Sequence, residues 1–494
     1  MGELAQMQAK PEAGGQGLRL TPFVMLLALG LLYALPVIFD GRYYLDDLPH
    51  AMNGLTLWEQ DGRPLASLMS SLTSFSWPSF SAPALYDASP LPQILGVVAL
   101  AYGAARLAQR LFPQGADVWQ CLVVFPVISS PFMLQNLSYK FDALTMSVAV
   151  MLALFAATAE AAWAVALLMV LALGFYQAAF NVFIGACALL WLVAGGGDRA
   201  FISKLLSGLV GLIVYTLLLK LLGGLVGDYA SAHSALVQVD VEGFKTVIFN
   251  AGFAAYFVNL LAQDAPLLAL GAVMALLGFA LRQWREENGA AGVLRLLLAT
   301  LLIFAAVAGL LLVLRQPVMR PRTLMGLSMV LVLVAFATHE VLKTTPALLR
   351  LALGLATAWF FVQANVYANA ARDQTRFEQA LSQDIVHALV QAGFKPGGKV
   401  AIDGVEPFSP MARNARRKNV MASLLQPNFN GHSEWGFRQL EFDGLEVSAI
   451  RDATDESLKA LCAEPALVTT PLFQIFIHDS TALVGFANGV CFRG

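Results

Sequence analysis

Residues 22–50 read PFVMLLALGLLYALPVIFDGRYYLDDLPH, an apolar run that leads within a few residues into the adjacent carboxylates of Asp46 and Asp47. The run at 22–39 is close to the ~20 residues that cross the ~30 Å hydrocarbon core of a bilayer. A charged side chain at such a boundary costs several kcal/mol unless it is solvated or used. The stretch therefore predicts a membrane protein with functional carboxylates at the lipid–water boundary.

The composition extends this prediction to the rest of the chain. Of its 494 residues, 58% are hydrophobic and only 13% are charged, whereas a soluble domain carries about 25% charged residues. We therefore expect a mainly α-helical, polytopic membrane protein with some soluble mass attached. A net charge of −2 gives no bulk electrostatic attraction for nucleic acid, so we expect no nucleic-acid partner.

Apolar runs of similar length recur along the chain and predict a helical bundle in the lipid bilayer. The run from 162 to 194 is too long for one crossing, and Gly174, Tyr176, Gln177 and Asn181 interrupt it. Splitting it there predicts about 11 transmembrane helices, with the two ends of the bundle segment on opposite sides. The predicted crossings are 22–39, 91–111, 118–136, 141–159, 162–175, 176–194, 203–223, 265–281, 293–314, 322–340 and 347–365.

The basic residues orient this bundle, because Lys and Arg favour the cytoplasmic side of membrane proteins. We place residues 1–21 inside as a cytoplasmic tail, and all but one of the short inner turns then carry a basic residue. These residues are Arg106, Arg110, Arg199, Lys204, Arg282, Arg285, Arg295, Lys343 and Arg350. The outer side then receives two long loops, 40–90 and 224–264, and everything after about residue 366.

Both outer loops carry helical patterns. Between Asp47 and Phe75, apolar residues at helical spacing predict two short amphipathic helices on the outer membrane surface, separated by Gly62-Arg63-Pro64. The loop at 224–264 has a similar pattern near its end. These segments are therefore expected to be ordered parts of the outer face.

The composition changes again near residue 369, which divides a transmembrane domain at 22–368 from a small α/β domain at 369–494. The predicted elements are helices at 374–394 and 411–425 and strands at 400–402, 446–450, 467–470, 473–478 and 482–486. The domain follows the last crossing on the outer side, where an oxidising compartment permits disulfides. Cys462 and Cys491 could then pair, although the sequence does not fix their separation.

Two interpretations of the acidic pair compete. Asp followed by Leu-Pro is good helix-start chemistry, so one aspartate, Asp47, could simply be an N-cap. That leaves Asp46 unexplained. In the functional interpretation, a carboxylate acts as a base toward an acceptor hydroxyl or helps to bind a cation beside a phosphate.

Several cations on the predicted outer side break the positive-inside pattern. Arg315, Arg320 and Arg322 share one short turn, and Lys140 lies two residues before Asp142 in another. A phosphate would explain them, because arginine forks match its oxygens. The alternative for Lys140 and Asp142 is a local ion pair of little energetic value. We expect the three charged turns to converge on one pocket at the end of the bundle.

Three other polar residues have weaker cases. Tyr176 and Gln177 at the predicted helix break could contact substrate or could only satisfy freed backbone groups. His50 lies near Asp46 and could contact metal or sugar, although a lone histidine is usually a surface or packed residue. No zinc-type ligand spacing is present among the six histidines and four cysteines.

Two segments resemble a known family. The first is Tyr44-Leu45-Asp46-Asp47 followed by Asp61-Gly62-Arg63-Pro64-Leu65, and the second is the turn Asn136-Leu137-Ser138-Tyr139-Lys140-Phe141-Asp142. Together they resemble the Gtr-type O-antigen (serotype-converting) glucosyltransferases, a family of GT-C membrane glycosyltransferases. The resemblance covers roughly residues 22–365, and the C-terminal domain matches only loosely.

The resemblance implies transfer of one sugar, glucose in the first instance, from a polyprenyl-phosphate donor to a periplasmic glycan such as O-antigen, with inversion. It implies a bacterial inner membrane location, with the C-terminal domain in the periplasm. Asp46 and Asp47 would supply the base, and a divalent cation such as Mg or Mn on that pair stays open. Lys140, Arg315, Arg320 and Arg322 would hold the donor phosphate. The substrate-binding residues would be Tyr44, His50, Arg63, Tyr139, Asp142, Tyr176 and Gln177.

Other functions remain open at this point. The sequence does not define the sugar, so an arabinofuranose donor and a protein or cell-wall acceptor are alternatives. A transporter or flippase for a lipid-linked glycan would need polar residues near the bilayer midplane and often shows two related halves, and we find no repeat. A non-catalytic membrane subunit would be indifferent to substitution of Asp46 and Asp47.

Overall fold

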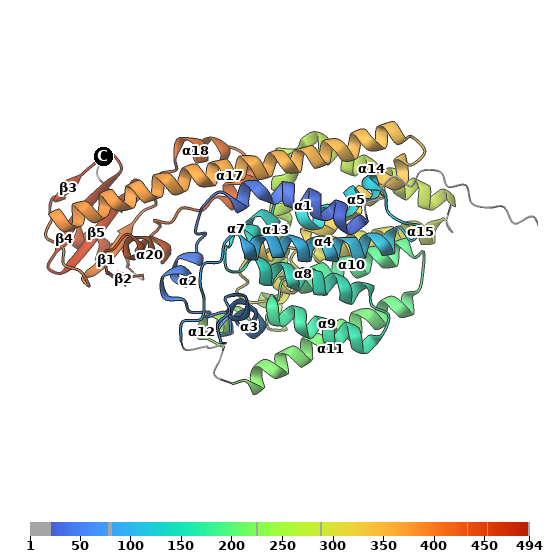
Figure 1. Cartoon of the computed structure of the whole chain (residues 1–494), viewed down its shortest axis with the longest axis horizontal. Coiled ribbons are helices and arrows are strands. Elements are labelled where there is room, and N and C mark those ends of the chain that lie inside the picture. Colours follow the sequence, from blue (N-terminus) through green and yellow to red (C-terminus); the bar gives the residue numbers. More distant parts are fainter. Residues whose placement is uncertain are drawn as a thin grey trace, which may run out of the picture.

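The computed structural model is mainly helical, with a bundle at one end and a small unit containing a β-sheet at the other (Figure 1). It describes residues 21–77, 82–223, 226–286, 289–431, 433–451 and 453–492. Of the predicted tail at 1–21, only Thr21 falls within these ranges. One long helix, α17 (Pro346–Gln391), runs through the bundle and on into the small unit.

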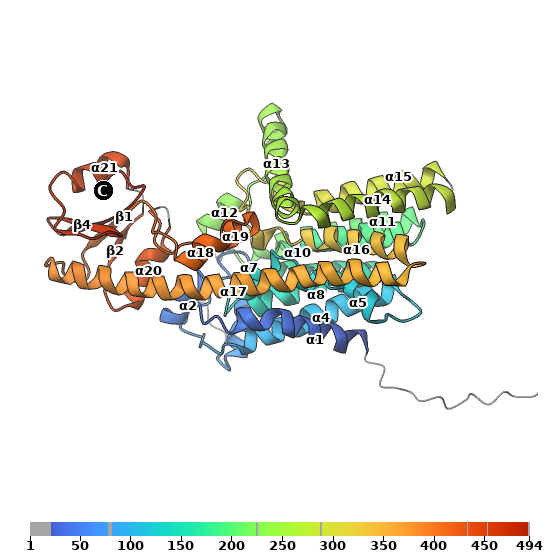
Figure 2. The ribbon, with the colours of Figure 1, turned by 90° about the horizontal axis from the view of Figure 1, so that it is seen from above.

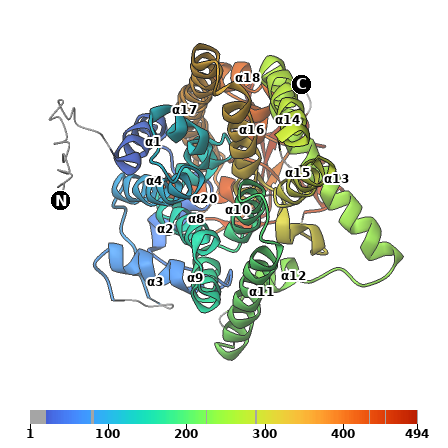
Figure 3. The ribbon, with the colours of Figure 1, turned by 90° about the vertical axis from the view of Figure 1, so that its right-hand side faces the viewer.

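The bundle helices lie side by side, as the end-on view shows (Figure 3). The expected break near residue 176 is present, because one helix ends at Phe175 and the next begins at Ala179. Besides α17, the helices are α1 (Pro22–Ile38), α4 (Leu91–Leu111), α8 (Ala143–Thr158), α9 (Ala162–Phe175), α10 (Ala179–Val193), α11 (Asp198–Leu221), α14 (Pro266–Glu286), α15 (Ala290–Ala305) and α16 (Leu327–Leu342).

Five helices in the described ranges are long and apolar enough to cross a membrane: α4, α11, α13 (Val241–Asp264), α14 and α17. Six apolar helices are shorter, namely α1, α8, α9, α10, α15 and α16. The chain is therefore a multi-pass membrane protein, while the number of about 11 crossings stays a prediction. Leucines and valines exposed on α11 and α14 provide the lipid-facing surface that such a bundle needs.

The predicted crossing at 118–136 is wrong as a single helix. The segment forms three short helices: α5 (Val118–Val124), α6 (Pro126–Ser129) and α7 (Met133–Ser138). Pro126 and Pro131 lie at the two breaks, and proline lacks the backbone N–H that continues a helix. As a result, α7 ends beside the turn that carries Tyr139 and Lys140.

Small residues let α4 approach α8 closely. A Cβ atom on Gly96 would lie 2.9 Å from Ser147 Oγ, and one on Gly103 would lie 3.1 Å from Met151 Cα. Close backbone packing of this kind is a main source of helix association in lipid. Because α8 begins directly after Asp142, this contact fixes the position of the 139–142 turn.

The helices predicted for the loops at 40–90 and 224–264 are present. The first loop forms α2 (Asp47–Asn53) and α3 (Pro64–Thr73), with Pro64 at the start of α3. The second forms α12 (Asp228–His233) and α13, which runs across the bundle direction (Figure 2). Asn250 attaches α13 to the bundle by donating to the carbonyls of Leu311, Leu312 and Leu314 at 3.0–3.2 Å.

The C-terminal unit contains a five-stranded sheet with the order β2-β1-β5-β4-β3. Its core strand alternates: Val400 and Ile402 pack toward α17, whereas Ala401 packs on the other face with Cys462 and Cys491, which form a disulfide. The strands are β1 (Lys399–Asp403), β2 (Ser448–Ile450), β3 (Val468–Thr469), β4 (Phe473–His478) and β5 (Thr481–Phe486), and the helices are α18 (Pro410–Ala415), α19 (Asn419–Leu424), α20 (Trp435–Phe442) and α21 (Asp455–Leu461).

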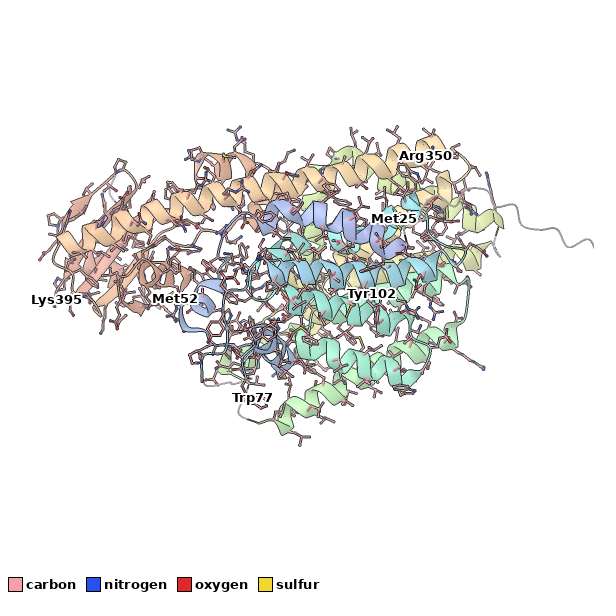
Figure 4. The ribbon with its side chains drawn as sticks, viewed as in Figure 1. Met25, Met52, Trp77, Tyr102, Arg350 and Lys395 are labelled. Atoms are coloured by element: carbon pink, nitrogen blue, oxygen red, sulfur yellow. A yellow bond between two sulfur atoms is a disulfide. The ribbon has the colours of Figure 1, made fainter. Side chains whose placement is uncertain are left out.

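Three helix predictions, two in this unit and one in the neighbouring bundle, need correction. The basic helix at 411–425 is two short helices, α18 and α19, separated at Arg416-Arg417-Lys418. The helices predicted at 347–365 and 374–394 form one helix, α17, of 46 residues. At ~1.5 Å per residue it is about 69 Å long, and Figure 4 places Arg350 and Lys395, near its two ends, at opposite ends of the molecule.

The continuity of α17 can be tested at Asn369, which is exposed in its middle. Asn369→Pro should cost about 3 kcal/mol or more, because proline removes a helix hydrogen bond and clashes with the preceding turn. We expect a lower melting temperature in detergent and new protease cleavage near residue 369. The control Asn369→Ala preserves the helix and should behave as wild type. Equal stability of both variants would contradict a continuous helix.

Candidate functional site

The candidate site lies where α1 leaves the bundle, and Asp46 is at its centre. Its side chain is 44% exposed. Oδ2 accepts a hydrogen bond from Arg322 Nη1 at 3.1 Å, and Oδ1 accepts one from Trp435 Nε1 at 3.1 Å. The carboxylate is thus held between an arginine of the bundle and a tryptophan of the C-terminal unit, and part of it is open to a ligand.

Arg322 is fixed from several sides. Its guanidinium donates to the Tyr139 hydroxyl and lies 5.2 Å from the centroid of that ring. Its backbone N–H donates to Gln135 Oε1 at 2.7 Å, and its carbonyl accepts from the Tyr176 hydroxyl at 3.4 Å. This short 3₁₀ turn, η2 (Pro321–Thr323), is therefore pinned to α7 and to the break between α9 and α10.

Asp47 has a different environment from its neighbour. It is 1% exposed, and its carboxylate accepts the backbone N–H groups of Tyr44, Lys140 and Phe141 at 2.9, 3.0 and 3.3 Å. Burial raises the pKa of Asp47 to about 8, although the three donors act in the opposite direction. Asp47 therefore ties the first loop to the 139–142 turn and does not face the open side of the site.

The structure does not support the interpretation of Asp47 as a helix N-cap. Asp46 occupies the N-cap position of α2 but makes no side-chain capping bond, and Asp47 directs its carboxylate to the three groups named above. The two aspartates therefore have separate roles. One is available to a ligand, and the other holds two chain segments together.

Asp142 pairs with Arg63 and not with Lys140, which corrects the local ion pair considered from the sequence. The contact is bidentate, at 2.5 and 2.8 Å, and both side chains are buried. Arg63 Nε also donates to the Phe175 carbonyl at 2.7 Å, and its guanidinium lies 4.7 Å from the Tyr176 ring centroid. The pair fastens the first loop to α8 and to the end of α9.

Lys140 points to the outer edge of the same region. Its Nζ lies 3.9 Å from the Tyr43 ring centroid and 3.8 Å from Asp87 Oδ2. The Tyr43 hydroxyl donates to the same carboxylate oxygen at 2.7 Å. The backbone N–H of Lys140 thus bonds to Asp47, while its ammonium group lies against Tyr43 and Asp87.

The other two arginines of the predicted cluster have exposed side chains. Arg320 lies within electrostatic reach of Tyr44, as Arg322 does. Arg315 lies further along the segment, where its backbone N–H donates to the Ala235 carbonyl at 2.8 Å. The structure therefore joins Arg322 to Asp46 and brings Arg320 near Tyr44, whereas the backbone of Arg315 is attached to the segment that carries Ala235.

Three predicted substrate-binding residues serve as supports. His50 is buried against the Trp58 ring at 4.5 Å between centroids, and its Nδ1 bonds to the Leu55 carbonyl. Gln177 donates to the Asp61 carbonyl and to the Tyr215 hydroxyl, both at 2.9 Å. The buried Tyr44 donates to the Leu424 carbonyl at 2.9 Å, so it contacts the C-terminal unit.

Sequence reasoning missed two participants. Trp435 lies 389 positions from Asp46 along the chain, and no local pattern connects them. Asp61 belongs to the recognised Asp-Gly-Arg-Pro segment. Its side chain is exposed, but partial desolvation by its surroundings raises the pKa of Asp61, whereas the charge of Arg63 lowers it and that of Asp46 raises it. The sequence signal that could have identified Asp61 was its position two residues before Arg63 in this segment.

The two carboxylates of the acidic pair face different partners. Asp47 is turned toward backbone donors, so only Asp46 could offer an oxygen to an ion beside a phosphate. Within the described ranges, no group of three His, Cys, Asp or Glu side chains is arranged to hold a metal. A cation at this site would therefore depend on Asp46 and on oxygens of the substrate.

An open carboxylate beside arginines at the end of a membrane bundle is suited to group transfer from an anionic substrate. The carboxylate can accept a proton from a hydroxyl, and the arginines can stabilise a phosphate. The membrane helices together with this carboxylate–arginine site place the protein in the class of multi-pass membrane transferases whose site lies at one end of the helical bundle.

Comparison with known proteins identifies the family. The model of the family described as glucosyl transferase GtrII matches residues 35–333, which is more than half of the chain. The chain belongs to this family and is a glycosyltransferase, so the resemblance seen in the sequence is confirmed. Its sugar donor and glycan acceptor follow in general terms from the family.

A more distant relative comes from Salmonella phage P22, where it is described as an uncharacterized 55.3 kDa protein in the gtrB 5'region. The two are 24% identical over 437 residues, which cover 83% of this chain and 87% of the phage protein. No solved structure matches the chain.

The Arg63–Asp142 pair yields a stability prediction. Arg63→Leu leaves a buried carboxylate without its partner and should cost about 3–5 kcal/mol. The double variant Arg63→Leu/Asp142→Leu removes both charges and should recover much of this loss, as measured by thermal unfolding in detergent. As a control, Arg110→Leu breaks the exposed pair with Glu160 and should change little. A double variant as unstable as the single one would contradict this role.

Asp47 yields a pH prediction. Its folded-state pKa of about 8 lies above the ordinary value of 3.8, so the folded state holds a proton that the unfolded state has lost between these values. Stability should therefore fall as pH rises from about 4 to about 8. Asp47→Asn stays neutral and should flatten this part of the melting-temperature curve, whereas the exposed control Asp455→Asn should keep the wild-type slope. Parallel curves for wild type and Asp47→Asn would refute the assignment.

Proposed function

We propose that this protein transfers a glucosyl group from a polyprenyl-phosphate donor to a periplasmic O-antigen glycan, with Asp46 as the catalytic base. The observation that carries the proposal is the position of Asp46, which is partly exposed and 3.1 Å from Arg322 at the end of the bundle. The family supports glucose and O-antigen in general terms. The polyprenyl-phosphate donor and the role of Asp46 as the base are what we propose beyond the activity of the family.

The proposed reaction is a single displacement. The acceptor hydroxyl gives its proton to Asp46 as its oxygen forms a bond with the anomeric carbon. The bond between that carbon and the phosphate oxygen breaks, and the polyprenyl phosphate leaves with the bonding electrons. Arg322 and Arg320 stabilise the negative charge that develops on the leaving phosphate. Attack from the face opposite the phosphate inverts the anomeric centre.

The orientation in the membrane is part of the same proposal. The basic residues of the predicted inner turns cap the bundle at the end away from Asp46, with Arg110 bonded to Glu160 and Arg282 to Glu340. The C-terminal unit at the site end contains the Cys462–Cys491 disulfide. A cytoplasmic basic end and an oxidising periplasm at the site end fit both observations.

The proposal predicts a large effect of one substitution at Asp46. With purified polyprenyl-phosphate glucose and lipid-linked O-antigen, Asp46→Asn should lower kcat by about 10²–10⁴-fold, because the amide cannot accept the hydroxyl proton. Donor binding should stay near wild type, since Arg322 and Arg320 are retained. The matched control Asp455→Asn, an exposed acid on α21, should transfer normally.

Each other outcome has a definite meaning. Normal transfer by Asp46→Asn would contradict the assignment of the base and direct attention to Asp61. Transfer from polyprenyl-phosphate arabinofuranose alone would retain the mechanism and change the sugar. Movement of the lipid-linked sugar across vesicles without transfer would favour a flippase. Loss of transfer in EDTA, restored by Mg or Mn, would add a cation between Asp46 and the phosphate.

A further inference from the structure

The C-terminal unit lies directly on the loop that carries the proposed base. Arg42 Nη2 donates to the Gln426 carbonyl at 2.8 Å, and the Tyr44 hydroxyl donates to the Leu424 carbonyl at 2.9 Å. A few residues further, α2 packs against α20, and the Tyr43 and Phe442 rings lie 5.8 Å apart. Residues 42–47 are therefore covered on one side by residues 424–442.

A second attachment holds the other end of this segment. The Asp264 carboxylate at the end of α13 accepts the backbone N–H groups of Asn419 and Val420 at 3.0 and 2.8 Å. These groups are at the start of α19, where a helix leaves its N–H groups free and favours a negative charge. Segment 419–442 is thus fixed to α13 on one side and to the first loop on the other (Figure 2).

Trp435 is the residue of this segment that reaches the reacting group. It is the first residue of α20, it packs against the bundle core, and its side chain is partly exposed. Its indole N–H donates to Asp46 Oδ1, while Arg322 occupies Oδ2. The two oxygens of the carboxylate therefore face different parts of the protein, the C-terminal unit and the bundle.

We propose that Trp435 is a positioning residue for Asp46 and that its ring forms the acceptor side of the site, so that the C-terminal unit selects the glycan acceptor. This inference rests on the proposed function. A hydroxyl that Asp46 deprotonates must lie about 2.6–3.2 Å from the carboxylate, and a group already 3.1 Å from that carboxylate is its immediate neighbour. Arg322 lies equally close to the other carboxylate oxygen, and because this cation serves the donor phosphate, the sugar that carries the hydroxyl lies against the uncharged neighbour, Trp435.

The residues on the two sides of Asp46 agree with a donor side formed by the bundle and an acceptor side formed by the C-terminal unit. The cations Arg322 and Arg320 come from the bundle segment, where a lipid-linked phosphate would arrive. A glycan acceptor is neutral over much of its surface and presents C–H groups on one face of each ring, which pack on an aromatic side chain with a polar edge. An indole that bonds to the base through its N–H and exposes part of its ring meets both needs.

The test separates the two roles of Trp435 with two variants in the full-length protein. Trp435→Phe retains an aromatic ring but loses the N–H donor, so kcat should fall about tenfold while KM for O-antigen stays near wild type. Trp435→Leu loses the ring as well, so KM for O-antigen should also rise, by about tenfold. Trp435→His restores a donor and should recover part of kcat. KM for the polyprenyl-phosphate donor should not change in any variant.

A control and a second measurement complete the design. Trp163→Phe changes an exposed tryptophan at the start of α9, at the other end of the bundle, and should leave both constants unchanged. Binding of O-antigen polysaccharide without donor should be weaker for Trp435→Leu than for Trp435→Phe, whether or not transfer occurs.

The outcomes separate this inference from the proposed function. If wild type transfers sugar but all Trp435 variants match it in kcat and acceptor KM, the inference alone is overturned. If the variants instead lose donor binding and melt early, Trp435 is only a structural contact and the inference is also overturned. If wild type transfers nothing, the proposed function fails, and equal polysaccharide binding by all variants would then overturn the inference separately.

Discussion

Charged groups at the edge of a membrane bundle must be paired or solvated, and this constraint organises the site end of the protein. Arg63 and Asp142 neutralise each other where the first loop meets α8. Asp47 receives three backbone N–H groups and joins the same loop to the 139–142 turn. An unpaired charge at the Arg63–Asp142 position would cost several kcal/mol, and loss of the Asp47 side chain would leave three N–H groups without their acceptor, so these contacts fix the loop. Asp46 is held on this fixed loop and stays partly open.

The sequence predicted most elements because their signals are local. Apolar runs located the bundle helices, Pro64 marked the start of α3, and the short run Val400-Ala401-Ile402 located β1. The errors arose where average hydropathy or composition did not reveal where a helix breaks or continues. Pro126 and Pro131 break a run that hydropathy treats as continuous. The polar stretch after residue 365 separated two predicted helices, at 347–365 and 374–394, but with no proline or glycine to stop it α17 continues through this stretch.

The site was predictable in part for the same reason. Asp46 and Arg322 stood out because each is a charge where hydrocarbon ends, and the structure joins them. Their partners could not be assigned, because a charge pattern does not say which arginine meets which aspartate. Asp142 pairs with Arg63, 79 positions away, and not with its near neighbour Lys140. Trp435 carries no charge and lies in a segment with only a loose family resemblance, so no sequence pattern placed it beside Asp46.

The position of Asp46 between two structural units connects the fold to specificity. The bundle supplies Arg322 to one oxygen and the C-terminal unit supplies Trp435 to the other. If related enzymes share one lipid-linked donor, the bundle residues that bind it would stay the same among them. If they use different glycan acceptors, the residues of the C-terminal unit that contact the acceptor would differ. Because α17 is one continuous helix and Asp264 fastens α19, the second side is held rigidly enough to position a base. Changes within segment 419–442 could then alter the acceptor without disturbing the groups that stabilise the leaving phosphate.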